Sequence, residues 1–139
     1  MFRKIVFANE GSPAGDRALL YLEHLGRREG SEVVVVHAFQ VPHNYASTEA
    51  FDELHSAYEK AAWMIVDDAV QELERAEVLV RGIVREGSAA QVILEVAEEE
   101  NASLIVLGTR GPSNTAELLL GSVSTEVLRF ARCPVMSVP

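Results

Sequence analysis

Five short apolar runs alternate with longer amphipathic segments along this chain, and this alternation constrains the fold more than any other feature. The runs cover residues 4–8, 32–39, 78–85, 104–107 and 134–138. Their length and their content of β-branched residues predict strands, whereas the segments between them carry apolar residues at helical spacing. Alternation of this kind requires right-handed crossovers, so we expect an open five-stranded parallel sheet with helices on both faces.

Local signals at the ends of the segments place the helices. Ser12 is a suitable N-cap and Pro13 suits the first helical position, while Gly26 and Gly30 are expected to bracket the end of this first helix. Further helices are expected over 50–76, from a Gly87-Ser88 cap through residue 100, and over 122–132.

Several charged and aromatic residues are expected to have purely structural roles. Arg81 and Arg85 give the third run a wetter face, which predicts an edge strand. Tyr58 and Trp63 lie in the long helix and are expected to pack in the core. The acidic residues 98–100 are expected to form a solvated helix end, although negative charge there opposes the helix dipole.

Composition and charge exclude several classes of function. A chain of 139 residues is expected to form a single domain over 1–139. The net charge is −9, from 21 acidic and 12 basic residues, and the bases form no stripe, so nucleic acid is not an expected partner. No apolar run approaches the roughly 18 residues that span a membrane, and no signal peptide is expected. The one cysteine, Cys133, fits a reducing compartment, so we expect a cytoplasmic location.

A glycine-rich segment after the fourth apolar run is the strongest functional signal. Two residues separate Gly108 from Gly111, nine more follow, and Gly121 and Ser122 then begin the last expected helix. Glycines in such a turn let the backbone approach a ligand closely and adopt positive φ. A helix start presents N–H groups that suit an anion, most often phosphate. The segment therefore predicts a nucleotide phosphate site.

Two common nucleotide motifs are absent from the sequence. A Walker loop requires Gly-Lys followed by Ser or Thr, and the only lysines are Lys4 and Lys60. The dinucleotide fingerprint needs three glycines after the first strand, where the turn offers only Gly11. Ligands of parallel sheets bind beyond the carboxyl ends of the strands where strand order reverses. If the first and fourth strands are neighbours at that point, Glu10 and Gly108 share one crevice.

The remaining pattern, Gly-x2-Gly-x9-Gly-Ser, resembles that of the universal stress protein family, in its small, single-domain, ATP-binding branch. The resemblance covers essentially all 139 residues: an acidic-Gly-Ser turn after the first strand, His37 near the end of the second, and a closing Cys-Pro-Val strand. It implies a Rossmann-like, adenine nucleotide alpha hydrolase-like fold that binds ATP together with Mg²⁺. It also implies a homodimer through the C-terminal strand and a regulatory or stress-survival role.

The resemblance assigns the glycine-rich segment to the sugar and phosphates of the nucleotide. Gly108 would lie against the ribose. The residues that would surround or contact the phosphates are Gly111, Gly121, Ser122, the N–H of Val123 and the hydroxyl of Ser124. Arg110 is expected either to touch phosphate or to be a solvated cation of the loop.

The base and ribose side of the expected site comes from the first two strands. Ala38 would line the adenine pocket through its backbone. Asn9 and Glu10 stand where the family usually has Thr and Asp, and Ala8 stands where it often has Pro. Glu10 keeps the charge of the family residue and is expected to contact ribose or metal. His37 is expected to be a buried, hydrogen-bonded residue rather than a catalytic base.

No activated nucleophile, acid–base pair or catalytic metal cluster is evident, so at most slow ATP hydrolysis is expected. Three alternatives remain at this stage. A nucleotide-free stress protein would act through protein contacts alone. An ATP-using enzyme, such as an adenylyl-transferring ligase, would need an added substrate domain. A flavin-binding electron carrier would be coloured when purified.

Overall fold

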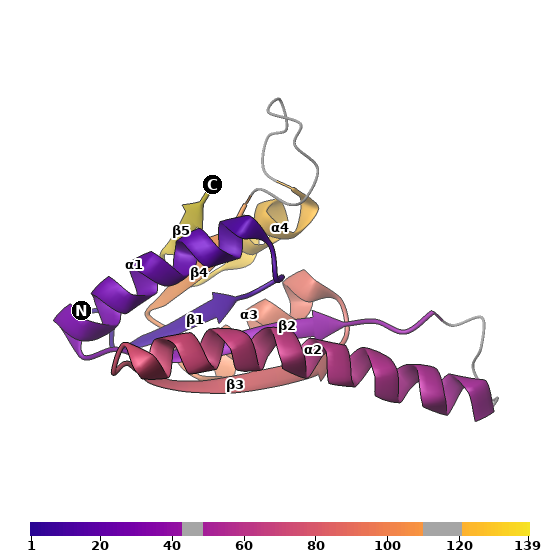
Figure 1. The fold of residues 1–139 in the computed structure, drawn as a ribbon. Coiled ribbons are helices and arrows are strands. Elements are labelled where there is room, and N and C mark those ends of the chain that lie inside the picture. Colours follow the sequence, from indigo (N-terminus) through magenta and orange to yellow (C-terminus); the bar gives the residue numbers. More distant parts are fainter. Residues whose placement is uncertain (43–48, 110–120) are drawn as a thin grey trace.

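The computed structural model describes residues 1–42, 49–109 and 121–139, in which strands and helices alternate strictly (Figure 1). In chain order the elements are β1 (Lys4–Ala8), α1 (Pro13–Glu29), β2 (Glu32–Phe39), α2 (Glu49–Arg75), β3 (Leu79–Glu86), α3 (Ala89–Glu99), β4 (Leu104–Gly108), α4 (Ser122–Phe130) and β5 (Val135–Val138). Neighbouring strands are parallel and follow the order β3-β2-β1-β4-β5. The predicted fold class is confirmed, and β3 lies at an edge as expected.

Serine side chains cap the starts of α1 and α3, which follow the carboxyl ends of β1 and β3. Ser12 Oγ accepts from the Gly15 N–H at 3.3 Å at the start of α1. Ser88 Oγ accepts from the Gln91 N–H at 3.5 Å at the start of α3. At the other end of α1, Gly30 adopts a left-handed conformation with φ 65°, which a glycine does without steric cost.

Gly26 does not bracket the end of α1, contrary to the sequence prediction. It lies inside the helix and is buried. A Cβ atom at this position would lie 2.6 Å from Val78 Cγ1, so the glycine allows α1 to approach the start of the third strand closely. The helix therefore continues past Gly26 because packing there outweighs the low helix propensity of glycine.

The sheet separates two hydrophobic cores. Along β2, Val33 and Val35 pack with residues of α1 and α2, whereas Val34 and Val36 pack with residues of α3 and α4. All four valines are at most 1% exposed. A strand covered on both faces needs apolar side chains at every position, which explains the unbroken valine run. The prediction of helices on both faces is confirmed.

The long helix α2 extends well beyond the strands that it covers. Its buried residues are Ala62, Val66, Ala69 and Leu73, and its first half projects past the carboxyl ends of β1 and β2 (Figure 1). Tyr58 and Trp63 are 37% and 38% exposed, so the prediction that they pack in the core is wrong. No helix among the described residues, α2 included, has an apolar stretch that could cross a membrane.

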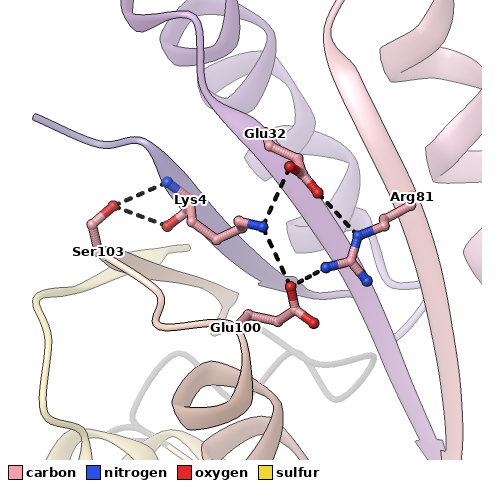
Figure 2. A network of polar contacts seen from close by, with 5 residues as sticks. All are labelled: Lys4, Glu32, Arg81, Glu100 and Ser103. Atoms are coloured by element: carbon pink, nitrogen blue, oxygen red, sulfur yellow. Dashed lines mark hydrogen bonds and ion pairs between the residues drawn. The ribbon is translucent and has the colours of Figure 1, made fainter.

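Charged side chains join the amino ends of the strands to the end of α3 (Figure 2). Lys4 Nζ lies 3.3 Å from Glu32 Oε2 and 3.4 Å from Glu100 Oε1. Arg81 Nε donates to Glu32 Oε1 at 2.9 Å, and Arg81 also pairs with Glu100. The bond from Arg81 is the main reason that the pKa of Glu32 is lowered, and Lys4 adds to it. Ser103 Oγ accepts from the Lys4 N–H at 3.2 Å and donates to the Lys4 carbonyl at 3.0 Å.

The acidic end of α3 is not merely solvated, which corrects the sequence expectation. Glu98 Oε1 lies 3.5 Å from Arg132 Nη1, and Glu99 Oε1 accepts from Arg85 Nη2 at 3.1 Å. Arg85 lowers the pKa of Glu99 in turn. With Glu100 held in the network of Figure 2, each of the three acids has a cation from another part of the chain. These cations offset the unfavourable placement of acids at a helix C-terminus.

Candidate functional site

Strand order reverses between β1 and β4, and this reversal locates the candidate site. From β1 the chain adds β2 and β3 on one side and β4 and β5 on the other. Ala8 is in register with Leu107, so β1 and β4 end side by side. Glu10 follows β1 and Gly108 ends β4. The first and fourth strands are therefore neighbours where strand order reverses, and Glu10 and Gly108 lie at the same edge of the sheet.

A cavity of about 220 Å³ opens at this edge of the sheet, beside the ends of β1 and β2. It is lined by Ala8, Asn9, Glu10, Val36, His37, Ala38, Ala89 and Ile93. Ligand pockets for drug-sized molecules have volumes of roughly 300–1,000 Å³. This cavity can therefore hold one ring system, and the rest of a larger ligand would lie along the open edge of the sheet. Four residues expected at the base and ribose side of the site converge here.

The side chain of Asn9 is buried and makes two hydrogen bonds within the protein. It is 7% exposed, and its Oδ1 accepts from the Gly11 N–H at 3.1 Å while its Nδ2 donates to the Ile65 carbonyl at 3.2 Å. Its backbone N–H also donates to the Val36 carbonyl at 3.0 Å. Asn9 thus borders the cavity and ties the end of β1 to β2 and to α2.

His37 has one ring nitrogen fixed as a donor. Its Nδ1 lies 2.6 Å from the Asn9 carbonyl oxygen, and a carbonyl oxygen can only accept. The proton must therefore sit on Nδ1, which leaves Nε2 of the neutral ring as an acceptor. The predicted hydrogen bond of His37 near the end of β2 is confirmed, whereas the residue is partly buried rather than buried as expected.

Glu10 contributes an unpaired negative charge to the crevice. It is exposed, and its carboxylate has no hydrogen bond or ion pair with any described residue. Within the same residues no group of three or more His, Cys, Asp or Glu side chains is placed to hold a metal ion. A cation at Glu10 would therefore need further ligands from a bound anion.

The start of α4 differs from the serine-capped starts of α1 and α3. Its N-cap is Gly121, and no side-chain cap hydrogen bond is made there by the described residues. The first bond of the helix is from the Thr125 N–H to the Gly121 carbonyl, so the N–H groups of Ser122, Val123 and Ser124 have no acceptor within the helix. These donors and the positive end of the helix dipole suit an anion.

The position of α4 follows from its packing. Val127, one turn after the helix start, belongs to the same core cluster as the buried residues of α3, and α4 contacts α3 and β5, so it lies on the same face of the sheet as α3 and beside β5. Since α4 returns the chain to begin another parallel strand, its start lies at the carboxyl edge. Ser124 in the first turn is only 6% exposed. The expected contacts of Arg110 and Gly111 lie outside the described residues.

The two described glycines of the motif have different surroundings. A Cβ at Gly108 would lie 2.9 Å from Ala14 C and 2.9 Å from Gly15 N, in the first turn of α1. A Cβ at Gly121 would meet no described atom within 4 Å, and its φ of −62° is open to any residue. The backbone angle at position 121 therefore does not require glycine. At position 108, packing against α1 requires a residue without a Cβ.

Sequence reasoning did not expect Val36 of β2 in the cavity wall, and it also missed two residues of α3, Ala89 and Ile93. A signal for them was present, because Gly87-Ser88 follows β3 at the same carboxyl edge as Glu10 and Ala38. The alanine keeps the wall of the cavity shallow where the helix begins.

These features define an open parallel α/β protein with a cavity beside the ends of β1 and β2, next to the reversal of strand order, and with a start of α4 at which the described residues make no side-chain cap. A model of the universal stress protein family matches residues 1–139. The chain belongs to this family.

Individual relatives agree over nearly their whole length. Universal stress protein YxiE of Bacillus subtilis is 31% identical, with 99% of each chain covered. The universal stress protein in the QAH/OAS sulfhydrylase 3′ region of Thermus aquaticus is 35% identical, again with 99% of each chain covered. The solved structure of protein MJ0577 of Methanocaldococcus jannaschii superposes with a TM-score of 0.88 at 27% identity, covering 99% of this chain and 96% of that one.

Two more distant structures share the fold and contain nucleotides. A universal stress protein solved in complex with cAMP has a TM-score of 0.75 at 21% identity, with 99% of this chain and 97% of that one covered. A family member from Arabidopsis thaliana with AMP bound has a TM-score of 0.71 at 20% identity, with 98% and 90% covered.

Proposed function

We propose that this protein binds ATP at the carboxyl edge of its sheet. The observation that carries the proposal is the start of α4, where Gly121 provides no cap and three backbone N–H groups lack an intrahelical acceptor. Phosphate oxygens would accept from these groups. The starts of α1 and α3 already have serine caps, so α4 is the helix start best suited to a phosphate chain.

The adenosine part of the ligand fits the cavity beside β1 and β2. Its volume of about 220 Å³ suits one ring system, and Ala38 borders it from the end of β2. Adenosine is also the part that cAMP and AMP have in common, and two relatives of the same fold hold these molecules. The ligand would run from Ala38, past Glu10, to the start of α4.

Glu10 would act on the ligand through a metal ion or the ribose. Mg²⁺ in nucleotide sites is held by one or two carboxylates together with the phosphates and water, and Glu10 is an exposed, unpaired carboxylate in the crevice. A metal is also needed for electrostatic reasons, since the chain has a net charge of −9 and ATP is itself an anion. A regulatory or stress-survival role follows from the family, with nucleotide occupancy as the signal.

A homodimer through β5 and a cytoplasmic location complete the proposal. β5 is an edge strand in the described sheet. The carbonyls of Pro134 and Val138 accept from β4, so the N–H and C=O groups of the alternate residues, Val135 and Ser137, point away from it. A second copy of β5, paired antiparallel across a two-fold axis, would satisfy these groups.

Isothermal titration calorimetry with ATP, with and without Mg²⁺, tests the proposed site. We expect ATP to bind more tightly than AMP, because only the longer phosphate chain reaches α4. Gly121→Ser supplies a side-chain cap, so it should raise stability by about a few tenths of a kcal/mol while it weakens ATP binding by competing for the same N–H groups. Gly121→Val, which adds bulk in the same space, should abolish binding without unfolding the protein.

Glu10→Gln separates the two roles of the carboxylate. A loss of affinity seen only with Mg²⁺ would identify a metal contact, and an equal loss in both conditions would identify a ribose contact. Absence of heat with every adenine nucleotide would refute the proposed function. The nucleotide-free alternative would then be preferred, since packing against α1 already accounts for Gly108 without any ligand.

A further inference from the structure

The buried side chain of Asn9 connects the turn between β1 and α1 to α2. Asn9 is 7% exposed, and the amide group at its end makes two hydrogen bonds to different parts of the chain. Oδ1 accepts from the Gly11 N–H at 3.1 Å, within the turn itself. Nδ2 donates to the carbonyl of Ile65 at 3.2 Å, in the middle of α2. The donor at Gly11 and the acceptor at Ile65 together fix the orientation of the amide.

The main chain of Asn9 extends the same set of contacts to β2. Its N–H donates to the Val36 carbonyl at 3.0 Å, and its carbonyl accepts from His37 Nδ1 at 2.6 Å. One residue thus connects the end of β1, the following turn, the end of β2 and α2. Every polar group of Asn9 has at least one protein partner, and the residue is only 7% exposed, so its side chain is directed into the protein rather than towards the cavity mouth.

The surroundings leave little room for this side chain to move. A Cβ at Gly15 would lie 2.7 Å from Asn9 Oδ1, so the amide is packed directly against the first turn of α1. Gly11 has φ +75° and its Cβ position lies 3.4 Å from Ile65 Cγ1, so the turn also rests on α2. Glu10, between these two anchored residues, is exposed and has no hydrogen bond or ion pair with any described residue.

We propose that Asn9 is a positioning residue of the candidate nucleotide site, which holds Glu10 and His37 in place without touching the nucleotide. The inference rests on the proposed function. Glu10 is flanked by Asn9 and by Gly11, to which Asn9 is bonded, so the direction of its carboxylate depends on the Asn9 amide. His37 donates from Nδ1 to the main-chain carbonyl of Asn9, and this bond leaves Nε2 as the acceptor. The orientation of the ring therefore follows the backbone that the Asn9 amide anchors.

The test compares Asn9→Ala with Ser103→Ala, a matched control at the opposite end of β1. Ser103 Oγ also makes two hydrogen bonds, both with the backbone of Lys4, so both variants remove two hydrogen bonds of a side chain. We expect Asn9→Ala to weaken ATP binding roughly tenfold and Ser103→Ala to leave it within about twofold, at equal losses of thermal stability. Asn9→Thr, which keeps one acceptor for the Gly11 N–H, should recover part of the affinity.

A measurement without nucleotide accompanies the titration. Amide hydrogen exchange at Gly11 should accelerate in Asn9→Ala and remain as in wild type in Ser103→Ala, because only the first variant removes its acceptor. If Asn9→Ala does not fold, Asn9→Leu, which has nearly the shape of asparagine but neither hydrogen-bonding group, carries both measurements. Failure of the wild type to bind ATP would overturn the proposed function and this inference with it. ATP binding by the Asn9 variants as tight as by Ser103→Ala would overturn this inference alone.

Discussion

Gly108→Ala should destabilise the fold because a methyl group at this position has no room. The added Cβ would lie 2.9 Å from Ala14 C, 2.9 Å from Gly15 N and 3.0 Å from Ala14 Cβ, whereas carbon atoms pack best at about 3.5–4.0 Å. Two of these three atoms belong to the backbone of α1, so the whole helix start must shift by roughly 0.5–1 Å. Overpacking of this kind costs about 1–3 kcal/mol, and contact with backbone places Gly108→Ala in the upper part of that range.

Differential scanning calorimetry measures the effect directly. A domain of this length loses roughly 3–5 °C in Tm per kcal/mol, so we expect Gly108→Ala to melt about 6–15 °C below wild type. Gly121→Ala is the control, because its Cβ meets no described atom within 4 Å and the change costs less than about 1 kcal/mol of capping preference. A Tm for Gly108→Ala within about 2 °C of wild type would refute the packing argument and leave a bound ligand as the reason for this glycine.

Two further predictions concern the ends of the sheet. Arg81→Met should lower stability by less than about 1 kcal/mol at neutral pH, since the ion pairs of Arg81 are partly exposed. Because Arg81 lowers the pKa of Glu32 below its ordinary 4.5, this contribution is present above pH 4.5 and is lost as the pH falls through the lowered value. Urea unfolding should therefore show the two proteins converging towards pH 3, and a gap that persists there would contradict the assignment. Ser137→Pro removes an outward N–H of β5 and should convert a dimer into monomer or aggregate in sedimentation velocity. An unchanged dimer would place the interface elsewhere.

Much of the fold could be predicted because local pattern and tertiary packing agree in this chain. The ranges expected for the first two strands match β1 and β2, since a run such as Val33 to Val36 fits only a strand buried on both faces. The other element ends differ by one or two residues. The last helix stops at Phe130 because Ala131 is already extended, with ψ 142°. That change in backbone angle has no clear signal in the sequence.

The errors arise where distant residues decide the outcome. Tyr58 and Trp63 were expected in the core because they lie in a long amphipathic helix, but helical periodicity does not show where the sheet beneath the helix ends. The acids at 98–100 obtain their cations from three other parts of the chain, so no local rule could pair them. Gly26 was interpreted as a helix terminator because its neighbour Val78 is far away in sequence.

The sequence predicted which edge of the sheet carries the candidate site, but it did not predict the different roles of the residues there. Glycine spacing and topology indicated that Glu10, Ala38 and the start of α4 belong to one edge of the sheet, and the structure brings their elements there. The spacing could not distinguish Gly108, which packs against α1, from Gly121, whose Cβ position has no described atom within 4 Å. That distinction depends on how closely a helix approaches a strand, which is a tertiary property.

The ion-pair network and the ligand crevice lie at opposite ends of the same strand, and this separation has a consequence for how the chain tolerates combined changes. Lys4 begins β1 and belongs to the network, while Ala8 ends it and borders the cavity. The four steps from Lys4 to Ala8 span about 13 Å of strand, which exceeds the roughly 7–10 Å beyond which the energetic effects of two substitutions usually add. Substitutions around Lys4 that raise stability should therefore add to the effects of substitutions that alter the cavity. The effect of either kind of substitution does not depend on whether the other is already present.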